Sequence, residues 1–257
     1  MLTRKRLAAR LNSSWDLRSS LQSLSELGLG GVVLEAMGEI APNNLSGTGR
    51  REIRALVRSA ELSIHAVALP MRRSIAERTD WDKRLSRLSE AMNLAYELGA
   101  STVNLAPGPV PLTDSEKQRY QTHLIQLADL ADHQGVQISL ETGLEQSDSL
   151  ITLLHEVRHP MLRIVFDPGR LALTGQNNEK FASDAHDLIS MVVTTDPEFL
   201  GLGNIARGKT IHWNEILEII EELGYRGPLL IWPDANLSLT GVISEMGRRL
   251  GATPRFS

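Results

Sequence analysis

Amphipathic helices that end in glycine and run directly into short β-rich segments recur along the whole chain. Glu97-Leu98-Gly99 precedes residues 102–105, and Glu222-Leu223-Gly224 precedes residues 229–232. Glycine suits these positions because the residue that ends a helix often adopts the left-handed conformation. The pattern therefore predicts a repeated unit of one helix followed by one strand.

Apolar residues spaced three and four apart define the helices, and short apolar segments between them define the strands. The clearest helical faces lie within residues 17–24, 53–60, 85–95, 124–131, 150–157 and 216–223, and Thr113 to Glu116 has the form of a capping box. The predicted strands are 7–10, 31–35, 63–69, 101–106, 136–141, 162–167, 190–195 and 228–232. Eight strands alternating with helices predict an α/β fold, a single (β/α)8 TIM barrel domain over residues 1–257. A doubly wound open sheet is the alternative, but no Gly-rich fingerprint follows the first strand.

Alternation within the strands separates the barrel interior from the face that packs on the helices. In residues 136–141, the apolar Val136, Ile138 and Leu140 are expected to face helices, which turns Glu141 inward. The inward polar residues predicted near the carboxyl ends of strands are Asn12, Glu35, Asn104, Glu141 and Asp167. Active sites of such barrels are built at that end.

Composition narrows the range of functions that this chain can have. The formal net charge is −4 and the chain has no cysteine. The mild acidity gives no basic surface for nucleic acid, and the lack of thiols leaves only oxygen or imidazole ligands for a metal. No apolar run of about 18 residues exists, and Arg10, Asn12 and Asp16 interrupt the N-terminal apolar segment. We therefore expect a cytoplasmic protein that acts on a small molecule, not on nucleic acid or a membrane.

Four segments together resemble the xylose-isomerase-like TIM barrel family, the sugar phosphate isomerase/epimerase superfamily. They are residues 139–142 (SLET), 165–169 (VFDPG), 200–205 (LGLGNI) and 224–229 (GYRGPL). Each is short, so the order of all eight units carries the resemblance. It implies a divalent metal, Mn, Mg, Co or Zn, which polarises a hydroxy-carbonyl substrate while two acidic groups move a proton.

Two of the four metal positions implied by the resemblance are changed here. The strand-five glutamate matches Glu141 and the strand-six aspartate matches Asp167. The strand-seven histidine falls on Val193 and the strand-eight glutamate on Trp232, neither of which ligates a metal. A histidine often found after the strand-six aspartate is Arg170. The resemblance thus predicts an incomplete metal site.

Other residues could complete the site only in a shifted register. Asp196 and Asp234 lie just past strands seven and eight and are the alternative ligands. The histidines are predicted elsewhere, on helices or, for His65, at the opposite end of strand three; they are His65, His123, His133, His155, His159, His186 and His212.

Each candidate also has a purely structural interpretation. Glu141 and Asp167 could be buried barrel carboxylates paired with Arg163 or Arg170, and Glu35 could be a polar lining residue. Trp232 could stack on a sugar or fill the space of the missing metal. The predicted substrate-binding residues are Glu35, Asn104, Arg170, Arg207 and Trp232, and Arg72, Arg73, Arg207 and Lys209 could hold a phosphate or carboxylate.

Two functions remain open. In the first, Glu141 removes a proton alpha to the carbonyl of a sugar or sugar phosphate and Asp167 ligates or orients the metal, as in an isomerase or epimerase; a lyase or dehydratase would share this step. In the second, the chain has lost catalysis and binds a small ligand for regulation. A third, an endonuclease at abasic sites, needs a histidine-rich metal cluster that this sequence does not predict.

Overall fold

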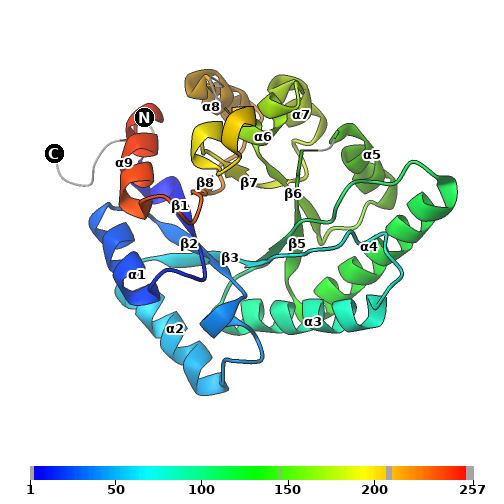
Figure 1. Cartoon of the computed structure of the whole chain (residues 1–257), viewed down its shortest axis with the longest axis horizontal. Coiled ribbons are helices and arrows are strands. Elements are labelled where there is room, and N and C mark those ends of the chain that lie inside the picture. Colours follow the sequence, from blue (N-terminus) through cyan, green and yellow to red (C-terminus); the bar gives the residue numbers. More distant parts are fainter. Residues whose placement is uncertain (1–2, 145, 207–209, 253–257) are drawn as a thin grey trace.

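The barrel is closed. The structure, a computed structural model, describes residues 3–144, 146–206 and 210–252. In this part of the chain eight parallel strands follow one another around the barrel in sequence order, with helices on the outside (Figure 1). β1 pairs with both β2 and β8, which closes the sheet. The predicted (β/α)8 TIM barrel is confirmed, and the open-sheet alternative is wrong.

The strands follow the predicted boundaries within a few residues, and the six predicted helical faces lie on helices, whereas α6, α7 and α9 have no counterpart among those faces. The strands are β1 (Leu7–Leu11), β2 (Gly31–Glu35), β3 (Ser63–Leu69), β4 (Thr102–Leu105), β5 (Gln137–Glu141), β6 (Leu162–Phe166), β7 (Ile189–Val193) and β8 (Leu229–Ile231). The α-helices are α1 (Leu17–Glu26), α2 (Gly47–Ser59), α3 (Trp81–Leu98), α4 (Asp114–Gln134), α5 (Asp148–Val157), α6 (Pro168–Leu173), α7 (Asn178–Asp184), α8 (Trp213–Glu222) and α9 (Leu239–Arg249). Short 3-10 helices are η1 (Arg4–Arg6), η2 (Gly38–Ile40), η3 (Pro197–Phe199) and η4 (Gly203–Ala206).

Glycine ends the helices as the pattern predicted. Gly28, Gly99 and Gly224 have φ values of 77°, 80° and 81°. The capping box is correct only in part. Thr113 does precede α4, but its hydroxyl donates to Glu116 Oε2 at 2.6 Å instead of accepting a backbone N–H.

Apolar side chains fill two separate layers, one between strands and helices and one inside the barrel. The inner layer is small and consists of Ala8, Val33, Ala66, Ala68, Val165, Met191, Val193 and Leu230, with Trp232 packed against it. Because side chains alternate along each strand, residues two positions beyond this layer point to the mouth of the barrel. These positions include Arg10 after Ala8, Glu35 after Val33 and Asp167 after Val165. No helix in the described part of the chain has the length and apolar character needed to cross a membrane.

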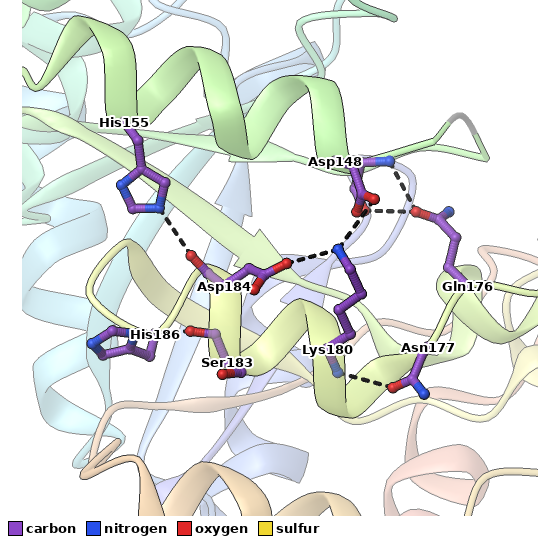
Figure 2. Close-up of polar contacts among 9 residues, drawn as sticks. Asp148, His155, Gln176, Asn177, Lys180, Ser183, Asp184 and His186 are labelled. Atoms are coloured by element: carbon purple, nitrogen blue, oxygen red, sulfur yellow. Dashed lines mark hydrogen bonds and ion pairs between the residues drawn. The ribbon is translucent and has the colours of Figure 1, made fainter.

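A polar cluster fastens α5 to α7 on the outside of the barrel (Figure 2). Lys180 Nζ lies 3.2 Å from Asp148 Oδ2 and 2.7 Å from Asp184 Oδ2. Ser147, just before α5, donates its backbone N–H and its hydroxyl to Gln176 Oε1. The cluster therefore ties the start of α5, which follows β5, to the segment that comes after α6, which follows β6.

Candidate functional site

An arginine from the first strand joins two acidic side chains inside the mouth of the barrel. Arg10 Nε donates to Glu35 Oε1 at 3.1 Å, and Arg10 Nη1 donates to Glu141 Oε1 at 2.6 Å. The Arg10 side chain is 5% exposed and the two carboxylate side chains are 10% and 8% exposed. The other oxygen of Glu35 accepts the backbone N–H of Ser13 at 3.3 Å. Ion pairs with so little solvent fix the positions of all three side chains.

Asp167 lies beside this group and caps helix α6. Its Oδ1 accepts the backbone N–H of Arg170 at 3.0 Å, and Arg170 Nε is 3.4 Å from Oδ2 without the geometry of a hydrogen bond. Burial raises the pKa of Asp167 to about 6. The Arg170 guanidinium and the hydrogen bond from the Arg170 backbone N–H lower this pKa, whereas the negative charge of Glu141 raises it further. Asp167 can therefore exchange a proton near neutral pH, and its Oδ2 has no hydrogen-bond partner among the described residues.

The guanidinium groups of Arg10 and Arg170 both lie over the ring of Trp232. The guanidinium carbon of Arg10 lies 3.8 Å from the ring centroid and that of Arg170 lies 4.5 Å from it. Trp232 follows β8 directly, and its backbone N–H donates to Thr195 Oγ1 at 2.6 Å. Cation–π attraction to the tryptophan ring thus adds to the ion pairs that hold the two guanidinium groups.

The remaining metal position of the resemblance is apolar. Val193 is fully buried in the inner layer. Asp196, one of the two alternative ligands in a shifted register, has other partners here: it accepts from Trp213 Nε1 at 2.9 Å and pairs with Arg249. Asp234 Oδ1 closes a local turn with Asn236. Among the described residues, no three His, Asp or Glu side chains are grouped so that they could hold a metal ion.

One predicted substrate-binding residue, Asn104, lies outside this cluster, and another, Arg207, is not among the described residues. Asn104 is 1% exposed inside the barrel; its amide nitrogen lies 3.8 Å from Met191 Sδ, and its Oδ1 has no partner among the described residues. Arg207, together with Lys209, lies outside the described residues.

The structure brings Arg72 and Arg73 together with basic residues of α3. They line a cavity of about 590 Å³ just beyond the end of β3, with Lys83, Arg84 and Arg87. Asp80 is the acidic residue among the described residues that line it. The cavity opens next to Met37, two residues past Glu35. Such a set of cations favours an anionic group.

The sequence pattern did not identify Arg10 as a site residue, and it placed one expected partner of the acids, Arg163, at the wrong end of the barrel. Arg163 was expected as a possible partner of the acids, but it lies at the opposite end of the barrel, where its Nη1 donates to the backbone oxygen of Asp187 at 2.6 Å. The alternation that placed Asn12 inside also places Arg10 inside, two residues earlier. The sequence signal that could have identified Arg10 was the group of inward carboxylates, which had no matching inward cation.

Comparison with known families agrees with this architecture. The model of the family described as xylose isomerase-like TIM barrel matches residues 21–241. The chain belongs to this family. The sequence matches none of the curated proteins.

Solved structures of the xylose isomerase-like fold superpose over nearly the whole chain. A xylose isomerase domain protein from Planctomyces limnophilus has a TM-score of 0.75 at 19% identity and covers 98% of this chain and 94% of its own. A 3-keto-D-glucoside 4-epimerase from E. coli has a TM-score of 0.74 at 14% identity, with 96% and 97% covered. D-psicose 3-epimerase from Clostridium cellulolyticum H10, solved with D-tagatose, has a TM-score of 0.74 at 15% identity, with 95% of each chain covered. At identities this low, the superpositions show a shared fold and do not by themselves show a shared function.

Proposed function

We propose that this xylose isomerase-like barrel catalyses proton transfer at a carbon alpha to a carbonyl group, in a sugar or sugar acid bound at the barrel mouth. The reaction is that of an isomerase or epimerase. The observation that carries the proposal is Asp167, a buried carboxyl group whose pKa is raised to about 6 and whose Oδ2 is free of hydrogen bonds within the described chain. A carboxyl group with a pKa near the working pH can both accept and return a proton.

Asp167 takes the proton from the substrate carbon, and this assigns to Asp167 the step that the sequence favoured for Glu141. The negative charge that develops on the carbonyl oxygen is then stabilised by the guanidinium groups of Arg170 and Arg10. Glu141, held by Arg10, supplies a second carboxylate close enough to influence the charge of Asp167. Return of the proton by Asp167 to the neighbouring carbon, with the hydroxyl proton passing to the former carbonyl oxygen, gives isomerisation. Donation of a proton to the opposite face of the same carbon by a second acid gives epimerisation.

The basic cavity beyond β3 supports a narrower substrate class. Arg72 and Arg87 line it, and an anionic end of the substrate, a carboxylate or a phosphate, would bind there while the carbonyl end reaches Asp167. In the variants R72M and R87M we expect KM to rise for anionic sugars and to stay unchanged for neutral sugars. R58M, an exposed arginine on α2, is the control.

Hydrogen exchange tests the proposal across several substrate classes at once. Aldoses, ketoses, sugar acids and sugar phosphates are incubated with the protein in D2O, and deuterium alpha to the carbonyl is measured by mass spectrometry and NMR. We expect incorporation with the wild type and its loss in D167N, where the amide can still cap α6 but cannot accept the proton. D16N is the matched control, because Asp16 caps α1 on the surface.

A binding protein without catalysis is the second candidate, and the occupied mouth favours it. Val193 and Trp232 stand at two of the four positions where the family resemblance implies a metal ligand, and the ring of Trp232 packs against Arg10 at the mouth. A compound that raises the melting temperature of the protein but exchanges no alpha proton would contradict the catalytic proposal and support this second function.

A further inference from the structure

The family resemblance implies a divalent metal, but the donor set of this barrel does not fit one. Glu141 Oε1 already accepts from Arg10 Nη1, and Asp167 Oδ1 already accepts the N–H of Arg170. The two other expected ligand positions are Val193 and Trp232, whose side chains have no acceptor for a metal. An incoming divalent cation would also meet two guanidinium groups, and like charges in a site with little solvent repel strongly.

The positive charge that a metal would supply is present in another form. Arg10 comes from β1, reaches Glu35 on β2 and Glu141 on β5, and is almost fully buried. Both ion pairs, at 3.1 Å and 2.6 Å, are also hydrogen bonds.

The two changes at the site are complementary. A glutamate at position 232 would add an acid next to Arg10, whereas Trp232 offers an apolar ring at 3.8 Å from the guanidinium carbon. That ring stabilises the cation without adding charge. Val193 removes the last nitrogen ligand and extends the apolar inner layer beneath the site.

We infer that Arg10 replaces the metal of this barrel: a built-in guanidinium, anchored on Glu141 and Glu35 and stacked on Trp232, is the cation of the site. Only the catalytic consequence rests on the proposed function, in which this cation stabilises the enediolate oxygen. The exchange of metal for guanidinium concerns binding and can be tested without turnover.

The first test compares Mn²⁺ binding by calorimetry and by the EPR signal of free Mn²⁺. The proteins are the wild type, the double variant V193H/W232E and the triple variant R10A/V193H/W232E. We expect no saturable binding by the wild type and weak binding by the double variant. The triple variant should bind about 100-fold more tightly than the double variant, because a like charge a few ångströms away has been removed. Stoichiometric micromolar binding by the wild type, or equal affinity of the double and triple variants, would overturn the inference.

A single variant covers the case in which the triple variant does not fold. R10A leaves Glu35 and Glu141 around an empty cation position, so Mn²⁺ or methylguanidinium should raise its melting temperature and leave that of the wild type unchanged. R163A, which lacks an arginine at the other end of the barrel, is the control and should not respond. If R10A gains nothing from either cation, the inference fails.

These outcomes separate the inference from the proposed function. Cation binding that follows the expected pattern, without deuterium exchange in any substrate, refutes only the proposed function. Deuterium exchange by the wild type that is abolished by a chelator and restored by Mn²⁺ refutes the inference and leaves the proposed function intact.

Discussion

The protonation of Asp167 couples the stability of the barrel to pH in a direction opposite to that of most carboxyl groups. Its pKa rises from 3.8 to about 6 on folding, chiefly through burial. The folded state therefore binds this proton more tightly than the unfolded state, so the stabilisation is complete below pH 3.8 and is lost as pH rises through about 6.

The magnitude follows from the size of the shift. About two pKa units correspond to about 3 kcal/mol in total, of which about half is lost between pH 5 and pH 7.5. The variant D167N keeps the side-chain oxygen that caps α6 but has no proton to lose. The free energy of unfolding of D167N minus that of the wild type should therefore rise by about 1–2 kcal/mol over this range.

Urea unfolding followed by tryptophan fluorescence measures this difference. With an m-value of about 2.5 kcal/mol/M, the gap between the two midpoints should move by about 0.5 M from pH 5 to pH 7.5. D16N is the control with the opposite sign. Backbone and side-chain hydrogen bonds from Ser19 lower the pKa of Asp16, so its stabilisation is present at neutral pH and declines as pH falls. A midpoint gap for D167N that does not change with pH would refute the assignment of a raised pKa.

Two further predictions concern the elements that support the site. Arg249 joins α9 to Asp196, which is 1% exposed, so R249M should cost about 3 kcal/mol in urea unfolding by stripping a buried carboxylate of its cation. R248M is the matched control, because the side chain of the neighbouring Arg248 is 72% exposed; it should lower the free energy of unfolding by less than about 0.5 kcal/mol. A cost equal to that of R249M would contradict the argument. A Cβ on Gly30 would collide with the main-chain oxygen of Lys5 in η1, so G30A should lower stability by about 3 kcal/mol or more. G47A, with open space around the new methyl group, should be neutral or slightly stabilising, and equal melting temperatures for both variants would show that the close approach at residue 30 is relieved at no cost.

The alternation of side chains along the strands was enough to predict which acids meet. Glu35, Glu141 and Asp167 belong to three different helix–strand units, yet each lies at an inward position near the end of its strand. Parallel strands in a closed barrel share one end, so the inward period of two brings these residues together. The geometry of the barrel, which the sequence implies, does this without any specific contact.

The partners of those acids depend on side-chain reach, which alternation does not give. In the sequence Arg10 only interrupts an apolar N-terminal run, and Arg163 is as suitable a partner as Arg170. Arg163 lies four residues before Asp167 on the same chain segment, and because of this separation its side chain lies at the other end of the barrel. The basic cavity was hidden for a related reason, because α3 contributes Arg84 and Arg87 from the far side of a loop.

The position of Arg10 on β1 also decides which fragments of this chain are worth studying. The segment matched to the family begins at residue 21, after β1, and ends within α9. A chain shortened to that segment would leave β2 and β8 with unpaired edges, since β1 pairs with both, and exposed edges promote aggregation. It would also leave Glu35 and Glu141 without their guanidinium. Such a fragment would look like a defective metal enzyme, because the strand that carries its cation had been cut away.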